Sequence, residues 1–245
     1  MKVLVIGDSC IDKYVYGDAK RLSPEAPVPV LDYIRTDSTE GMAYNVFNNL
    51  NAFGIETHLL TNDEEIVKTR YIDEKSNQQI LRVDNEFEFA PFDDVDLDLD
   101  NNYDALVISD YDKGFITQMQ LFELASRFVG PVFIDTKKNR IPENAFVKIN
   151  WSEYEKLLHC DLDNLIITKS GEGAEYQGKL YPAEKVKVFD VVGAGDTFLA
   201  ALTYGYLKYG SIEEAIPLAN KAAAIAVSHR GTYVLKEEDV KTLLC

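Results

Sequence analysis

The sequence predicts a single α/β domain in which helices cover a mostly parallel sheet. Three observations support this. From residue 105 onward, short apolar runs alternate with segments of helical periodicity, a pattern typical of parallel sheets. The chain opens with an apolar run at 2–6 that is typical of a core strand. At 245 residues, 46% of them hydrophobic, the chain is long enough to bury one sizeable core.

The composition limits which binding partners and which cellular compartment we expect for this protein. The formal net charge of −16, from 25 basic and 41 acidic residues, opposes general attraction to nucleic acid or to an anionic membrane, so we expect neither. No apolar run reaches 18 residues, and residues 1–7 are too short for a secretory signal, which favours the cytoplasm. The cysteines, Cys10, Cys160 and Cys245, are scattered and odd in number, which favours reduced thiols over a disulfide framework.

The first strand, at 2–6, precedes two carboxylates, Asp8 and Asp12. We expect them in a loop just beyond its carboxyl end, where open α/β sheets bind ligands. They could bind sugar hydroxyls or simply form turns. The next segment, 22–30, carries three prolines, which exclude a central strand and favour an extended edge or a flap.

A helix is predicted at 42–53 by its apolar spacing, and a short strand follows at 58–60. Two further strands, 69–72 and 79–83, flank a polar turn and predict a hairpin. Residues 86–102 are acidic and weakly periodic, which is typical of a surface connection.

The second half alternates between strands and helices. The expected elements are strand 105–108, helix 118–128, strands 132–134 and 146–149, helix 152–158, strand 165–168, short β segments at 174–177 and 179–181, strand 185–189, a helix beginning within 193–196, and helices 211–227 and 236–244. Polar clusters follow three strand ends, at 109–114, at 135–138, and at Asn150 with Glu153. Their shared position predicts a common cleft, and the Asn-x-x-Glu pattern could orient water around Mg²⁺.

The segment 189–199 is a glycine-bracketed turn that leads into a helix. Gly193, Ala194 and Gly195 leave the backbone open to an anion, which the first turn of a helix attracts. Asp196 then has two interpretations. It could cap the helix, which the turn alone favours, or it could be a general base beside an oxyanion cradle.

A second glycine-rich strand exit lies at 168–173, and two familiar motifs are excluded around it. Residues 173–179 match the phosphate-binding pattern G-x-x-x-x-G-K, but Leu180 replaces the required Ser or Thr and the context is a hairpin. Residues 171–176 lack the third glycine of a dinucleotide fingerprint. Neither motif therefore assigns a function.

Taken together, the motifs resemble the ribokinase-like (PfkB) carbohydrate kinases. The segment Asp190-x-x-Gly193-Ala194-Gly195-Asp196 matches the family's carboxy-terminal signature, after Gly7-Asp8-x-x-x-Asp12, Asn150-x-x-Glu153 and Thr168-x-x-Gly171-x-Gly173 in the expected order. Within the family, three strings resemble heptose 7-phosphate kinases: 22–30 (LSPEAPVPV), Asn77-Gln78-Gln79-x-Leu81-Arg82-x-Asp84, and Ser109-Asp110-Tyr111-x-Lys113-Gly114.

The resemblance implies a three-layer α/β/α sandwich over 1–245, with a small β lid at 13–39 and 69–89. It implies ATP-dependent phosphorylation of the anomeric hydroxyl of heptose 7-phosphate, with ATP, Mg²⁺, a monovalent cation such as K⁺, and a homodimer. A kinase for another sugar or sugar phosphate, or an idle nucleotide- or sugar-binding protein, remains open. His58, His159 and His229 form no H-x-G-H motif, so no nucleotidyltransferase activity is expected.

The resemblance also assigns site residues. Asp196 would be the base, and Gly193, Ala194 and Gly195 would form the anion hole. The sugar phosphate would contact Asp8, Asp12, Gly41, Asn45, Gln79, Asp110, Lys113 and Lys137. The nucleotide would contact Asn150, Glu153, Thr168, Ser170, Gly171, Gly173 and Asn220. Asn150 and Glu153 would hold magnesium through water, and Asp190 would support the monovalent cation.

This sequence departs from the family at three places. Met42 replaces the second of two adjacent glycines after the lid strand, which would narrow the sugar site. A β/α segment between 61 and 69 and helical material between 158 and 165 are missing. We expect a trimmed sheet as a result.

Overall fold

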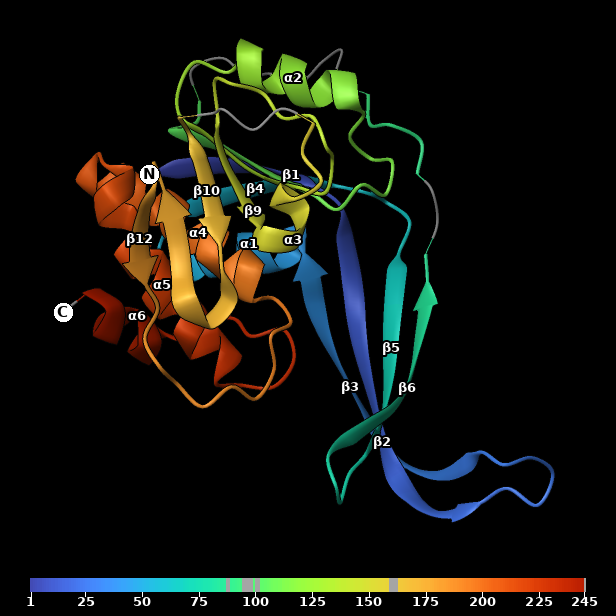
Figure 1. Ribbon diagram of the computed structural model, residues 1–245. Helices are drawn as coiled ribbons and strands as arrows, with labels where there is room; N and C mark the ends of the chain where they lie inside the picture. Colours follow the sequence, from blue (N-terminus) through green and yellow to red (C-terminus); the bar gives the residue numbers. More distant parts are fainter. Residues whose placement is uncertain (87–88, 94–98, 100–101, 159–162, 245) are drawn as a thin grey trace.

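The structure is a computed structural model that describes residues 1–86, 89–93, 99, 102–158 and 163–244. It contains two sheets and helices on both faces of the larger one (Figure 1). The large sheet contains β1 (Lys2–Gly7), β4 (Glu56–Thr61), β7 (Ala105–Asp110), β8 (Val132–Thr136), β9 (Phe146–Asn150), β10 (Leu165–Thr168), β11 (Gly173–Tyr176) and β12 (Lys179–Pro182). The small sheet contains β2 (Ser9–Leu22), β3 (Pro29–Met42), β5 (Ile66–Asp73) and β6 (Gln78–Asn85). The helices are α1 (Ala43–Ala52), α2 (Gln118–Arg127), α3 (Trp151–Tyr154), α4 (Ala194–Tyr209), α5 (Ile212–Val227) and α6 (Glu237–Leu244), with a 3₁₀ turn at Ser170–Glu172.

The large sheet has the order β12-β11-β10-β9-β8-β7-β1-β4. Its pairs from β4 to β10 are parallel, and β11 and β12 add an antiparallel edge. The central strands are continuous apolar runs because helices cover both faces; all six residues of β7, for example, are buried. The predicted mostly parallel sheet is confirmed.

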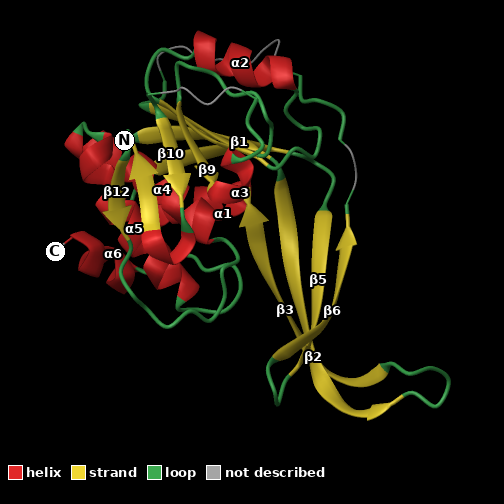
Figure 2. Cartoon of the chain, viewed as in Figure 1, coloured by secondary structure: helices red, strands yellow, loops and turns green. Residues whose placement is uncertain are grey.

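Two apolar clusters place the sheet in the middle of three layers. One joins the sheet to α1, α4, α5 and α6, and the other joins its opposite face to α2 (Figure 2). The expected α/β/α sandwich is therefore confirmed. Among the helices that the structure describes, none combines the length and apolarity needed to cross a membrane.

The small sheet, which we call the lid, projects from the body and has the order β3-β2-β5-β6. Its β5–β6 pair is the predicted hairpin, and the proline-rich segment forms the turn at the far end of the β2–β3 ribbon. Along β2 the even-numbered residues Cys10, Asp12, Tyr14 and Tyr16 are buried. The expectation that Asp12 lies in a loop is therefore wrong, because only Asp8 separates β1 from β2.

Two predicted elements differ in the structure. Residues 185–189 form no strand; they are exposed, and the N–H groups of Phe189 and Asp190 donate to the Val227 carbonyl at the end of α5. Alternating polarity alone does not make a strand, because a strand also needs a neighbouring strand to pair with. The helix expected at 152–158 ends at Tyr154, because the next bonds have i to i−3 spacing. Parts of the 86–102 connection, of the gap between 158 and 165, and Cys160 and Cys245 lie outside the described residues.

Candidate active site

The candidate site lies where several parallel strands end. A cavity of about 720 Å³ opens between these strand ends, the turn before α4 and the side of α5. A volume of this size is typical of sites for small molecules and cofactors. Its polar and glycine lining comprises Tyr111, Asp135, Lys137, Lys148, Asn150, Thr168, Ser170, Gly171, Gly173, Glu184, Lys185, Gly193, Gly195 and Asn220, and Ala194 lines it between the last two glycines.

The turn before α4 is shaped by its glycines. Gly193 is the N-cap with φ 75°, and no side chain caps the helix. The first N–H groups of a helix have no acceptor within it. Here the Ala194 N–H donates to the Val191 carbonyl at 3.4 Å, whereas those of Gly195 and Asp196 have no acceptor among the described residues and can bind an anion. A Cβ at Gly193 would lie 2.7 Å from Asn45 Nδ2, and one at Gly195 would lie 2.8 Å from Lys148 Nζ. The turn therefore has no room for larger residues.

Asp196 lies in the first turn of α4 and is 2% exposed. Tyr111 Oη donates to its Oδ1 at 2.8 Å, and Asn45 Nδ2 donates to its Oδ2 at 3.3 Å. The capping interpretation is wrong, because the carboxylate makes no cap hydrogen bond. Burial, with the nearby charge of Asp135, raises the pKa of Asp196 to about 7. A carboxylate with such a pKa can exchange a proton near neutral pH.

Asp8 lies at the end of β1 and is fully buried. Its Oδ2 accepts the N–H of Tyr111 at 2.6 Å, while its Oδ1 has no hydrogen-bond partner among the described residues. Burial, then the charge of Asp110, raises the pKa of Asp8 to about 6. A buried acceptor without a partner is costly unless a ligand satisfies it, and a hydroxyl group would do so.

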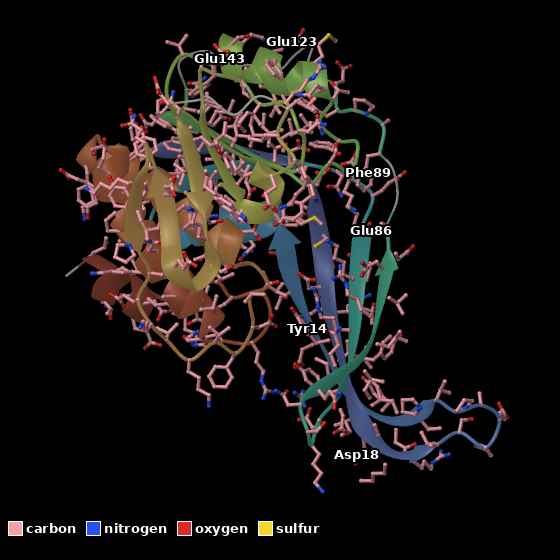
Figure 3. All side chains as sticks on the ribbon, in the orientation of Figure 1. Tyr14, Asp18, Glu86, Phe89, Glu123 and Glu143 are labelled. Atoms are coloured by element: carbon pink, nitrogen blue, oxygen red, sulfur yellow. The ribbon has the colours of Figure 1, made fainter. Side chains whose placement is uncertain are left out.

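Asp12, on β2 of the lid, is held by one residue of β5 and one residue of the loop 228–236, which we call the carboxy-terminal loop. Arg70 Nη1 from β5 donates to its Oδ1 at 2.5 Å, and Thr232 Oγ1 donates to its Oδ2 at 2.9 Å. A Cβ at Gly41 would lie 2.5 Å from Asp12 Oδ2, so glycine is needed there. Tyr14, two residues along β2, faces the body (Figure 3) and accepts the N–H of Thr232 at 3.2 Å.

The opposite end of the cavity is glycine-rich and apolar. Thr168, Ser170, Gly171 and Gly173 line it at the strand exit, and Val186, Val188, Ala223, Ala224 and Val227 supply apolar surface. The side-chain amide of Asn220 donates to the Tyr181 carbonyl at 2.8 Å, which holds α5 against β12. A flat apolar ring with a polar edge would fit this end.

Asn150 and Glu153 lie at the start of α3. Asn150 Oδ1 accepts the Glu153 N–H at 3.0 Å, Glu153 Oε2 accepts the Asn150 N–H at 2.8 Å, and Glu153 Oε1 contacts Lys137 Nζ. No group of three or more His, Cys, Asp or Glu in the described part of the chain could hold a metal directly. With these oxygens already accepting hydrogen bonds, a magnesium ion fits here through its water shell.

Of the eight expected substrate residues, Lys137 alone lines this cavity. Three of the others are engaged elsewhere or lie on the lid. Gln79 is exposed on β6, paired with Ile72 next to the hairpin turn. Asp110 accepts from Thr136 Oγ1 at 2.6 Å and pairs with Lys138 at 3.1 Å. Lys113 pairs with Glu86 at 2.6 Å, near where the lid joins the body (Figure 3).

Asp190 supports the turn from outside the cavity. Its Oδ1 accepts the Val192 N–H at 3.1 Å and its Oδ2 accepts the Gly231 N–H at 3.0 Å. It therefore ties the anion-binding turn to the carboxy-terminal loop. Each oxygen retains a lone pair, so a cation could also bind beside it.

Sequence reasoning missed Tyr111, Arg70, Thr232 and Lys148 as site residues. The signal for Lys148 was visible, because a lysine interrupts the otherwise apolar run 146–149. A charge in a buried strand is rarely unpaired, and this one pairs with Asp135 Oδ2 at 2.6 Å. Arg70 and Thr232 carried no such signal.

Part of the chain matches a family of known proteins. Residues 149–239 match the model of the pfkB family of carbohydrate kinases. The bifunctional protein HldE of a Nitratiruptor species is 32% identical over 300 residues, covering 98% of this chain and 64% of HldE. HldE of Pasteurella multocida is 32% identical over 303 residues, covering 99% and 63%. The chain thus spans less than two thirds of these relatives' length.

Solved structures with low sequence identity share the fold. Ribokinase from Thermotoga maritima has a TM-score of 0.73 at 20% identity, covering 99% of this chain and 98% of that one. Arabidopsis thaliana ribokinase, complexed with ribose and ATP, has a TM-score of 0.72 at 16% identity, covering 99% and 98%. Phosphofructokinase-2 of Escherichia coli, in complex with potassium, has a TM-score of 0.71 at 16% identity, covering 99% and 97%. These matches confirm the expected fold.

Proposed function

Because the chain carries a PfkB-family carbohydrate kinase domain on a ribokinase-like fold, we propose that it is an ATP-dependent kinase that phosphorylates the anomeric hydroxyl of heptose 7-phosphate. The observation that carries the proposal is Asp196, a buried carboxylate with a raised pKa next to an anion-binding turn, and that turn lines a cavity large enough for a nucleotide. An idle binding protein has no physical need for such a base.

In the proposed reaction, ATP lies in the cavity with its terminal phosphate at the Gly193–Gly195 turn. The sugar lies against Asp8, Asp12, Gly41 and Asn45. Its anomeric oxygen forms a bond to the γ-phosphorus while the bond between that phosphorus and the bridging oxygen breaks, which releases ADP. Asp196 accepts the hydroxyl proton. Positioning and charge neutralisation supply most of the catalysis in phosphoryl transfer.

The sugar end of the site supports a polyhydroxylated substrate. Asp8 offers an acceptor without a partner, and Asn45 is held beside Asp196 by its bond to the Gly193 carbonyl at 3.1 Å. The choice of heptose 7-phosphate rests on the resemblance of three sequence strings and on the HldE relatives. Lys113 and Lys137 are the proposed partners of its 7-phosphate, and both would exchange a carboxylate for the phosphate.

The proposed cofactors are magnesium and a monovalent cation. When bound, Mg²⁺ would neutralise charge on the phosphates, and Asn150 and Glu153 would hold its water molecules. Asp190 would support K⁺ beside the turn, as proposed from the sequence. The potassium complex of a structural neighbour is in line with this. Because the reaction needs ATP, we propose the cytoplasm as its compartment.

Coupled ADP release, with magnesium, ATP and a sugar panel, tests the proposal. The panel holds heptose 7-phosphate, fructose 6-phosphate, ribose and adenosine, and Asp196→Asn is the mechanistic control. We expect turnover with heptose 7-phosphate alone, lowered by about 10²–10⁴-fold in the variant. Preference for another sugar would contradict the proposed substrate but would leave the proposed kinase activity in place. ATP binding without turnover on any sugar would contradict the proposal that the protein is an enzyme.

A homodimer is proposed from the outer face of the lid. Val15, Tyr71 and Leu81 lie in one cross-strand row on the face opposite Tyr14, and Val83 extends it. Leu81 and Val83 are exposed at 54% and 45%, which is costly for apolar side chains that share one face. Sedimentation of the parent and of Leu81→Glu tests this: the parent should be a dimer and the variant a monomer. A monomeric parent would contradict it.

A further inference from the structure

We propose that Lys148 is a catalytic residue whose ammonium group binds the phosphoryl group transferred from ATP, and that Asp135 holds it in place. The proposal rests on the kinase function above and deepens it, because it adds a charged side chain to the backbone donors and the magnesium ion proposed for the transferred phosphoryl group. Nothing in the sequence motifs assigns a role to either residue.

The position of Lys148 supports this role. Lys148 comes from β9, is 4% exposed, and lines the cavity. A Cβ built on Gly195 would lie 2.8 Å from its Nζ, so the ammonium lies directly against the first turn of α4. A phosphate oxygen that accepts the free N–H groups of this turn would therefore also lie within reach of Lys148.

Charge is the second argument. The two carboxylates Asp135 and Asp196 are both buried at this end of the cavity, and the charge of Asp135 contributes to the raised pKa of Asp196. Together they would repel the phosphates of ATP, in a chain whose formal net charge is −16. The positive charge of Lys148 offsets the negative charge of one of these carboxylates. Of the other two lysines that line the cavity, Lys137 contacts Glu153 and Lys185 is exposed.

The unsatisfied oxygen of Asp135 is the third argument. Its Oδ2 binds Lys148 Nζ at 2.6 Å, whereas its Oδ1 is buried and has no hydrogen-bond partner among the described residues. Buried ion pairs contribute little net stability, and one with an oxygen left over contributes less. Such a pair is poorly explained by folding alone. A lysine held by one carboxylate oxygen and directed at an anion-binding turn is well suited to bind phosphate.

The proposed step moves no additional proton. Lys148 stays an ammonium group and donates hydrogen bonds to the oxygens of the γ-phosphate, most strongly when negative charge gathers there. The bond from the γ-phosphorus to the ADP oxygen breaks, the bond to the sugar oxygen forms, and Asp196 takes the hydroxyl proton. Preorganised charges of this kind accelerate such reactions by about 10²–10³-fold each.

The competing explanation is that Lys148 only neutralises Asp135. The two explanations differ in the double variant Lys148→Met with Asp135→Asn, which removes both charges together. If Lys148 only compensates Asp135, the double variant regains the parent's properties. If Lys148 binds phosphate, it does not. The double variant leaves neither charge of this pair buried without its partner, so it should fold even where Lys148→Met alone does not.

The experiment measures binding of AMP, ADP and ATP by calorimetry, with magnesium, to the parent, Lys148→Met, the double variant and Lys208→Met. Lys208 is an exposed lysine at the far end of α4 and serves as the matched control. We expect AMP affinity to be unchanged in all four. In Lys148→Met and in the double variant, ATP affinity should fall by about tenfold or more, and kcat by about 10²-fold or more.

Two outcomes would overturn the proposal: recovery of ATP affinity in the double variant, or an unchanged ratio of ATP to AMP affinity in Lys148→Met. A parent that binds ATP no more tightly than AMP would overturn it as well. The nucleotide-binding measurements test this proposal separately from the proposed kinase function. If no sugar is phosphorylated while ATP affinity still depends on Lys148, the phosphate contact stands and the kinase function fails.

Discussion

Tyr111 and Asp196, 85 positions apart in the sequence, are joined by a hydrogen bond of 2.8 Å from the tyrosine hydroxyl to the carboxylate. The bond links the end of β7 to the first turn of α4. It lowers the pKa of Asp196, against the larger effect of burial, which raises that pKa to about 7. The pKa of the proposed base is therefore adjusted by a residue that follows β7, far away in the sequence.

Replacing Tyr111 with Phe should shift the pH profile of the enzyme. Asp196 must be ionised to accept a proton, so kcat should rise with pH through the pKa of this group. Without the hydroxyl that pKa rises, so the acid limb moves to higher pH, and kcat at pH 7 falls about three- to tenfold. The measurement is kcat from pH 5 to 9. The other groups near Asp196, namely Asp135, Lys148, Lys137 and Cys10, are unchanged in this variant. An unshifted limb would contradict the prediction.

Replacing Asp8 with Asn should stabilise the protein at alkaline pH. The folded-state pKa of Asp8 is raised from 3.8 to about 6, so the folded state binds the proton more tightly than the unfolded state does. By linkage, this contribution to stability is present at low pH and is lost as pH rises through that window. The amide side chain of the variant does not titrate, so the variant does not lose stability in this way as the pH rises.

We therefore expect Asp8→Asn to melt higher than the parent at pH 8, by about 2 °C or more, with a smaller difference at pH 5. Thermal melts at both pH values measure this. Asp63→Asn, at an exposed position, should show no pH-dependent difference. Equal shifts at the two pH values would refute the linkage.

Met42 should tolerate Gly better than Ala. It is 3% exposed, yet its backbone has φ 59° and ψ −129°, a conformation that glycine adopts far more readily than other residues. Either substitution removes the buried side chain, at about 2–5 kcal/mol. Only Gly also relieves the backbone strain, by about 1–2 kcal/mol.

Urea unfolding of Met42→Gly and Met42→Ala measures this difference. In the helical control Ala201→Gly, the order should reverse, with Gly less stable than Ala by about 1 kcal/mol. A Met42→Gly protein that is less stable than Met42→Ala would contradict the prediction.

Replacing Arg70 with Met should destabilise the protein more than removing both members of its ion pair. Arg70 and Asp12 are both at least nine-tenths buried and their charged atoms lie 2.5 Å apart. Loss of the guanidinium leaves a buried carboxylate with Thr232 as its remaining donor, at a cost of about 3–5 kcal/mol. The double variant Arg70→Met with Asp12→Leu should recover most of this stability, but it should not recover sugar affinity. Chemical unfolding and KM for the sugar separate the two effects.

Several features were predictable because their causes are local. The alternation of apolar runs indicated the sheet, and the cap of α5 at Ser211 and the glycine turn at 193–195 fixed the ends of helices. The β5–β6 hairpin followed from two strands around a polar turn. The strand expected at 185–189 failed because alternation describes only one strand, while a strand also needs a neighbour.

The sequence by itself determined where the chain turns, which segments are apolar enough to be buried, and where a backbone can receive an anion, because these properties depend on a few adjacent residues. Only the tertiary structure decided that Asp196 contacts Tyr111 and makes no cap, that Lys148 lies against Gly195, that Arg70 pairs with Asp12, and that Gln79 is exposed on the lid. These contacts depend on strand order and register across tens to well over a hundred positions, which no local pattern encodes.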